Sequence, residues 1–223
     1  MIGCGGTERN SESALKDTVT GGDTASALTA GADPSEGPVV LFVGTSLTAG
    51  LGVSPGQAYP ALIQQKIREE ELPYRVVNAG ISGETSAGAE SRISWVLQQP
   101  FDVLLLETGA NDMLRGLAPA STEENIQAII DAVRAERPQA TIVLAGMLAM
   151  PNLGPAYVRE FEAIFPSVAE RNNLTLIPFL LEGVAGEREL NQADGVHPTP
   201  QGHELIAETV WEVLRPILEA AGS

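Results

Sequence analysis

Three side chains that together can perform nucleophilic catalysis stand at informative positions of this 223-residue chain. Ser46 lies three residues after the apolar run Val39–Val43, and Asp194 precedes His197 by three residues in Asp-Gly-Val-His-Pro. A serine hydroxyl is a weak nucleophile until a base removes its proton. An imidazole can accept that proton, and a carboxylate beside it fixes the tautomer and stabilises the resulting charge. We therefore predict Ser46 as a nucleophile with Asp194 and His197 as its acid–base partners.

Each of these residues also has a simpler structural interpretation. A serine after a strand commonly caps a helix or a turn, and Asp-Gly before a capped helix is an ordinary turn. Histidines are scarce, since the chain contains only His197 and His203. We expect His203 to lie on the surface of the last helix, because no acid is placed to orient it.

Two further residues could stabilise the charge that develops during such an attack. Attack on a carbonyl creates an oxyanion that needs preorganised hydrogen-bond donors. Suitable donors are the backbone N–H of Gly80, the side-chain amide of Asn111 and the backbone N–H of Ser46. The alternative is that Gly80 and Asn111 only form turns, since both residue types are frequent after strands.

The order of the expected elements predicts an α/β fold. Short apolar runs predict strands at Val39–Val43, Arg75–Asn78, Val103–Thr108, Thr141–Gly146 and Leu174–Ile177. Helices are expected near Pro60–Glu71, Ala87–Gln98 and Ser121–Glu136, then up to Arg171, and again from Pro200. Alternation of this kind implies a parallel sheet covered on both faces, with ligands bound beyond the carboxyl ends of its strands. Ser46, Gly80 and Asn111 all follow such ends.

Local signals predict where some helices begin and end. Ser121 and Glu124 have the spacing of a capping box that would open one helix. Thr199 is expected to cap the last helix, with Pro200 in its first turn. Pro216 is expected to bend or end that helix.

Composition excludes several classes of function. The net charge is −16 and no cluster of Lys or Arg occurs, so the chain lacks the basic face that a nucleic-acid partner requires. No run of 18 apolar residues is present, which argues against a transmembrane helix. Two histidines and one cysteine offer no metal-ligand cluster, so we expect no metal and no cofactor. We expect a monomer.

The first 37 residues are predicted to form a flexible acidic linker ahead of a domain at 38–223. They are rich in Gly, Ser, Thr and Ala, show no helical or strand period, and carry −4 of the net charge. Ile2-Gly3-Cys4-Gly5 resembles the end of a bacterial lipobox, in which the cysteine is lipidated. No apolar stretch precedes Cys4, so two interpretations remain open. Cys4 is either a lipid anchor in the cell envelope or periplasm, or a chance cysteine of a cytoplasmic protein that starts at Met1.

Taken together, the motifs resemble those of the SGNH hydrolases, also called GDSL esterases. Their nucleophile block, Gly-Asp-Ser-Leu, corresponds here to Gly-Thr-Ser-Leu at 44–47. The later blocks correspond to Gly80, to Gly-Ala-Asn-Asp at 109–112 and to Asp-Gly-Val-His-Pro at 194–198. The resemblance covers residues 38–220 and implies a three-layer α/β/α sandwich with five parallel strands in flavodoxin-like order. It also implies that Ser46 forms an acyl-enzyme.

Within that family the chain looks most like the branch of arylesterases, acyl-CoA thioesterase I and lysophospholipase L1. The apolar loop after the fourth strand resembles the acyl-binding loop of that branch, which makes its side chains candidates for substrate binding: Met147, Leu148, Met150, Pro151 and Leu153. The alternative for this loop is an ordinary strand end. An alternative function is a carbohydrate O-acetyl esterase, and a third is a catalytically inactive binding module.

One position departs from the family pattern. Thr45 stands where the family has aspartate. That aspartate is not the triad acid, so the chemistry is expected to survive the change. A threonine hydroxyl bonds the local backbone more weakly than a carboxylate does. We therefore expect the replacement to affect the rigidity of the turn that carries Ser46.

Overall fold

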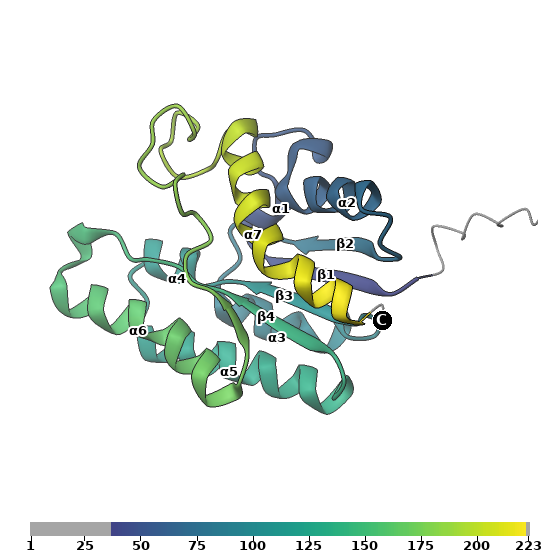
Figure 1. Ribbon diagram of the computed structural model, residues 1–223. Helices are drawn as coiled ribbons and strands as arrows, with labels where there is room; N and C mark the ends of the chain where they lie inside the picture. The colour runs from purple at the N-terminus through teal and green to yellow at the C-terminus, as the bar shows by residue number, and fades with distance from the viewer. Residues whose placement is uncertain (1–36, 222–223) are drawn as a thin grey trace, which may run out of the picture. The chain divides into compact units, whose positions relative to one another are not determined.

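A computed structural model describes residues 37–221 of the chain (Figure 1). The expected linker and Cys4 lie outside the described residues, except for Gly37. The described part contains one parallel sheet in the order β2-β1-β3-β4-β5. Its strands are β1 Val39–Gly44, β2 Arg75–Gly80, β3 Val103–Glu107, β4 Thr141–Ala145 and β5 Thr175–Ile177. This confirms the five predicted strands, each shifted at its ends by at most two residues.

Helices cover both faces of the sheet. Helix α2 (Tyr59–Glu69) packs against α7 (Pro200–Ala221) on one face. Helix α5 (Pro119–Glu136) packs between α3 (Ser86–Val96) and α6 (Pro155–Asn172) on the other face, as Figure 1 shows. The three-layer sandwich and its flavodoxin-like strand order are therefore confirmed. Short helical segments fill the connections: α1 Ser46–Ala49, η1 Pro55–Gln57, α4 Ala110–Leu114 and η2 Pro151–Leu153.

The central strands are apolar along their whole length because both of their faces are covered. Every residue of β1 and β3 is buried, and β4 is buried from its second residue on. Continuous Val, Leu and Ile runs are typical of such doubly covered parallel strands. The outer strand β2 is only half-buried. It ends at Gly80, on the side of the sheet where β1 and β3 also end.

Of the three predicted helix signals, the capping box is wrong and the Thr199 cap is confirmed, while Pro216 does not end its helix. Helix α5 begins at Pro119 with Ala118 as its N-cap, so Ser121 lies inside the first turn instead of capping it. Proline is well suited to that first position because it has no N–H to leave unsatisfied. Pro216 lies inside α7, which continues to Ala221. Thr199 does cap α7, since its hydroxyl accepts the backbone N–H of Gly202 at 3.3 Å.

His203 is buried, contrary to the prediction of a surface position. Its ring stacks on Tyr59 with 6.3 Å between centroids, and its Nδ1 accepts the Tyr59 backbone N–H at 3.3 Å. The reason is helical periodicity, because His203 shares the inward stripe of α7 with Ile206, Ala207 and Val210. Burial, together with the nearby His197, lowers the pKa of His203 to about 4. A packing role therefore replaces the expected surface role.

The turn that carries Ser46 is held by a buried carboxylate on the neighbouring strand. Glu107, the last residue of β3, accepts the Thr45 backbone N–H at 2.7 Å. It also accepts the hydroxyl of Thr45 at 2.9 Å and that of Thr48 at 2.8 Å. Gly44 makes this approach possible, since a Cβ there would lie 2.1 Å from Thr48 Oγ1. Thr45 thus bonds a carboxylate on another strand and not only its own backbone.

Burial and hydrogen bonding act on this carboxylate in opposite directions. Glu107 is completely buried, and this burial raises the pKa of its carboxyl above the ordinary value. The three donors from Thr45 and Thr48 favour the ionised form and oppose the rise. The Tyr59 hydroxyl lies 2.7 Å from Thr48 Oγ1 and extends the network toward α2.

This network makes Thr45→Asp a pH-dependent substitution. Aspartate would replace a hydroxyl donor with a second carboxylate facing Glu107, so the pair must share a proton. A shared proton raises a folded-state pKa, so the folded state is most favoured at low pH and loses stability as pH rises through that raised pKa. We expect Thr45→Asp to lose about 1–3 kcal/mol of unfolding free energy relative to the native chain between pH 5 and pH 8.

Denaturant unfolding across that pH range measures the effect. Thr45→Ser is the matched control, because it keeps the hydroxyl donor and should show no such dependence on pH. Near pH 5–6, where Thr45→Asp is folded, its activity should stay within about one order of magnitude, since no proton-transfer group has changed. Equal unfolding curves for Thr45→Asp and Thr45→Ser at both pH values would contradict the account.

Candidate functional site

Ser46, His197 and Asp194 form one continuous hydrogen-bonded chain. His197 Nε2 lies 3.0 Å from Ser46 Oγ, and His197 Nδ1 lies 2.7 Å from Asp194 Oδ2. We assign the ring proton to Nδ1, because the carboxylate can only accept there, which leaves Nε2 free to accept the serine proton. The fold therefore brings together three residues that sequence spacing could only suggest.

Asp194 is an acid held by backbone donors instead of by burial. Its Oδ1 accepts the backbone N–H groups of His197 at 3.0 Å and Val196 at 2.9 Å. The side chain remains 48% exposed. Hydrogen bonds from the backbone and ring of His197, followed by the Val196 N–H, hold the pKa of Asp194 well below its usual range. The carboxylate is thus ionised at neutral pH.

The loop with Asp194 and His197 is tied at its base to the loop that follows the nucleophile. Asn191 and Pro198 form an antiparallel bridge, and the Gln192 N–H donates to the His197 carbonyl at 2.7 Å. The Gln192 side-chain amide also donates to the Leu51 carbonyl at 2.7 Å. This amide links two segments 141 residues apart in the sequence. It therefore holds the loop with His197 close to the segment with Ser46.

Ser46 is the first residue of the short helix α1 and is buried. Its backbone N–H lies in the first helical turn, where no carbonyl of a preceding turn is available to accept it. Asn111 lines the same pocket as Ser46. One N–H of its amide donates to the Glu84 carbonyl at 3.0 Å, which orients the amide and leaves the second N–H available.

Gly80 differs from the other two expected donors. Its N–H donates to Asn78 Oδ1 at 2.9 Å, and it is not among the residues that line the pocket. The position still demands glycine, because a Cβ would lie 2.4 Å from the Ala49 nitrogen. Close packing against α1 is the clearest reason for this residue in the structure.

Asp112, next to Asn111, is buried and anchors the start of α4. It accepts the backbone N–H of Ser86 at 2.8 Å and the Ser86 hydroxyl at 2.6 Å. Thr122 adds a longer contact of 3.3 Å from α5. The acid of the Gly-Ala-Asn-Asp stretch therefore joins α3, α4 and α5 and holds Asn111 at the rim of the pocket.

An apolar pocket of about 610 Å³ opens beside Ser46. The loop after β4 forms one wall, with Met147, Leu148, Met150 and Pro151 all lining the pocket. Leu153 was also expected here, but it is not part of the lining. It ends the helical turn η2 and packs partly buried against the core instead.

Sequence reasoning missed much of the remaining wall. Helix α4 and its neighbour α1 contribute Leu47, Ala110, Met113 and Leu114, and α6 contributes Glu162. The loop after β4 adds Ala149, and the segment after β5 supplies the rest: Phe179, Leu181, Ala185, Gly186, Asn191, Gly195 and Val196. An apolar Pro-Phe-Leu-Leu stretch immediately after the last strand was a usable signal, since ligands bind beyond strand ends.

Among residues 37–221 no group of three or more His, Cys, Asp and Glu side chains is arranged to hold a metal ion. Within the same range no helix has the length and apolar character needed to cross a membrane.

Comparison with known proteins agrees with this geometry. The model of the GDSL-like Lipase/Acylhydrolase family matches residues 42–205. The chain is 41% identical over 180 residues to Esterase TesA of Pseudomonas aeruginosa, covering 80% of this chain and 89% of that one. It is 34% identical over 180 residues to Thioesterase 1/protease 1/lysophospholipase L1 of Escherichia coli K12, covering 80% and 84%.

The similarity extends to three dimensions. A crystal structure of TesA superposes with a TM-score of 0.76 at 40% identity, covering 80% of this chain and 98% of that one. The residues that the family model matches, 42–205, contain the four motif blocks and every contact of the Ser46–His197–Asp194 chain. The protein belongs to the GDSL-like lipase/acylhydrolase family, the SGNH hydrolases, and is a serine carboxylic ester hydrolase.

Proposed function

We propose that the protein hydrolyses aryl and acyl esters of short to medium chain length through an acyl-enzyme on Ser46. The observation that carries the proposal is the unbroken contact from Ser46 Oγ through His197 to Asp194. His197 Nε2 takes the hydroxyl proton while Oγ bonds to the ester carbonyl carbon. The same proton then goes to the leaving alkoxide, which departs as the alcohol.

Deacylation repeats these steps with water. His197 takes a proton from water, the hydroxide adds to the acyl carbon, and Ser46 Oγ leaves with the proton returned by the imidazole. The acid is released and the free serine is restored. Asp194 stays ionised throughout, holds the ring in one tautomer and stabilises it when it carries two protons.

The oxyanion of each tetrahedral intermediate is held by the Ser46 N–H and by the free N–H of Asn111. The Glu84 carbonyl supports this role, because it fixes the amide of Asn111 before substrate arrives. Gly80 contributes a third donor only when its N–H leaves Asn78 Oδ1. Ser46 and Asn111 are therefore the principal donors.

The shape of the pocket supports the choice of substrate. Three methionines and several leucines line it, and methionine adapts readily to ligands of different shape. Each buried methylene of an acyl chain contributes about 0.8 kcal/mol, so affinity should increase until the pocket is filled. A carbohydrate O-acetyl esterase would instead present polar groups for sugar hydroxyls. We propose that the enzyme acts as a monomer.

Ser46→Ala tests both the nucleophile and the alternative of an inactive binding module. We expect hydrolysis of p-nitrophenyl butyrate to fall to background and covalent labelling by a fluorophosphonate to disappear, because no other hydroxyl among residues 37–221 bonds to His197. Ser91→Ala, an exposed serine on α3, is the control and should keep both. Peptide mapping that places the label on another serine would refute the assignment, as would a native chain that takes no label.

Asn111→Ala tests the oxyanion donors. We expect kcat to fall by about 10²–10³, the usual loss for one such donor, with KM changing much less. Asn152→Ala removes a similar amide from an exposed position outside the pocket lining and should leave kcat unchanged. A two- or threefold loss at Asn111, equal to that at Asn152, would exclude this role.

We propose that the enzyme works in the cell envelope, attached by a lipid at Cys4. The Ile-Gly-Cys-Gly sequence at 2–5 supports this, as does the polar stretch that follows it and could serve as a tether. Mass spectrometry of protein expressed with its native upstream sequence should show a diacylglyceryl adduct on Cys4. An unmodified Cys4 in a soluble fraction would favour the cytoplasmic alternative instead.

A further inference from the structure

Glu162 places a carboxylate in the otherwise apolar substrate pocket. It lies on α6, is half-buried, and is the only residue with an acidic or basic side chain among the described residues that line the pocket. Its carboxylate has no hydrogen-bond or ion-pair partner in the described part of the chain. The nearest base along the helix, Arg159, is exposed and forms no ion pair with any described acid. The hydrolytic mechanism makes no use of this charge.

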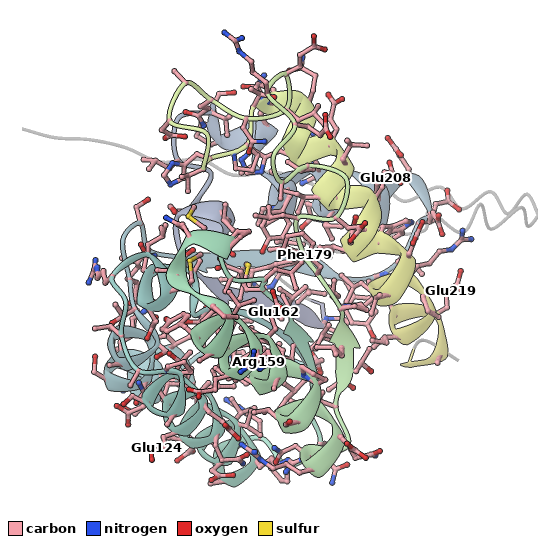
Figure 2. The ribbon with its side chains drawn as sticks, turned by 90° about the vertical axis from the view of Figure 1, so that its left-hand side faces the viewer. Glu124, Arg159, Glu162, Phe179, Glu208 and Glu219 are labelled. Atoms are coloured by element: carbon pink, nitrogen blue, oxygen red, sulfur yellow. The ribbon has the colours of Figure 1, made fainter. Side chains whose placement is uncertain are left out.

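Phe179 presents an aromatic side chain to the same pocket. It follows β5, is half-buried, and its ring pairs with no other aromatic ring of residues 37–221. Figure 2 labels Glu162 on α6 and Phe179 on the segment just above it. Aromatic faces attract cations, and quaternary ammonium groups are recognised by combining such faces with negative charge. A carboxylate and an unpaired aromatic ring in one pocket are thus suited to an organic cation.

The segment 178–196, which supplies part of the pocket wall, has a net charge of the same sign as Glu162. The segment 178–196 carries four exposed acids and one exposed base: Glu182, Glu187, Glu189, Asp194 and Arg188. Only Asp194 among these forms an ion pair, and its partner is His197. Within residues 37–221 no lysine or arginine lines the pocket. A cleft lined by one sign of charge raises the local concentration of opposite charges and repels like ones.

We propose that Glu162 and Phe179 form a subsite for a cationic group of the substrate, so that esters bearing an ammonium group are preferred. This inference rests on the ester hydrolase activity proposed above and specifies its substrate class. An ester of an ammonium alcohol places its cation a few bonds from the carbonyl carbon that Ser46 attacks. The same charges disfavour polyanionic leaving groups, including the nucleotide part of an acyl-CoA.

A pair of esters that differ only in charge tests the subsite. Butyrylcholine and 3,3-dimethylbutyl butyrate have the same shape, with a quaternary nitrogen in one and a carbon in the other. We expect Glu162→Gln to lower the ratio of their kcat/KM values, cationic over neutral, by about five- to tenfold, the effect of one partly solvated charge contact. Phe179→Leu should lower the ratio about two- to fivefold. Added salt should lower it in the native chain.

Glu160→Gln is the matched control. It removes the same charge from the same helix, but its exposed position lies two residues, or about 200°, around the helix from Glu162. An unchanged ratio in Glu162→Gln, or an equal fall in Glu160→Gln, would overturn the subsite. Hydrolysis of p-nitrophenyl butyrate without hydrolysis of butyrylcholine would also overturn it. Failure of the native chain on every ester would instead refute the proposed function.

A matched thioester pair tests the exclusion of anions. Butyryl-CoA and butyryl-pantetheine share the reacting bond, while only the former carries the phosphates. We expect the native chain to prefer the pantetheine thioester in kcat/KM by about tenfold at low salt, with the preference shrinking as salt screens the charges. Equal rates at low salt would contradict the electrostatic argument.

Discussion

The buried carboxylate of Glu107 is the contact on which the active-site geometry depends most directly. A parallel sheet brings strand ends to one edge, but hydrogen bonds within the sheet do not fix the loops that leave it. Glu107 provides such a contact, because its carboxylate connects the end of β3 to the turn after β1. It accepts hydrogen bonds from the N–H and hydroxyl of Thr45 and from the hydroxyl of Thr48. Burying a carboxylate is costly unless it is well bonded. Three donors offset that cost, and losing any one leaves a buried acceptor short of a partner.

The acid–base loop follows a different physical logic. Asp194 is half-exposed, yet its carboxylate is fixed by two backbone N–H groups and one ring N–H. These bonds act at contact distance and keep the acid ionised without removing it from water. The loop must then be placed over a serine 151 residues earlier in the chain, and the Gln192 amide does this by bonding the Leu51 and Pro198 carbonyls. Burial fixes the position of Ser46, the proposed nucleophile. Local hydrogen bonds fix the position of His197, its proposed base.

Much of this arrangement could be predicted from the sequence, and the failures have identifiable causes. Apolar runs located all five strands, most clearly β1, β3 and β4, because strands that are covered on both faces must be apolar. The triad followed from residue types and spacing in motif blocks. His203 was missed because the absence of a nearby acid was given more weight than the apolar period of α7, which places it beside Tyr59. Glu107 was not singled out, since a single acid at a strand end has no local signature. Whether a side chain lines the pocket depends on how loops and helix faces are oriented, and tertiary packing decides that orientation. This is why the sequence did not place Leu153, Glu162 and Phe179 correctly.

The position of Thr45 shows how a family motif can vary while its geometry is kept. What the turn requires from residue 45 is a backbone N–H aimed at Glu107 and a side chain compatible with a carboxylate 2.9 Å away. A hydroxyl meets the second requirement as a donor at every pH. An aspartate would meet it only while it and Glu107 share a proton. Threonine therefore avoids a second titratable group in the interior next to Ser46. The turn that carries Ser46 therefore keeps one set of hydrogen bonds from residue 45 to Glu107 as pH changes.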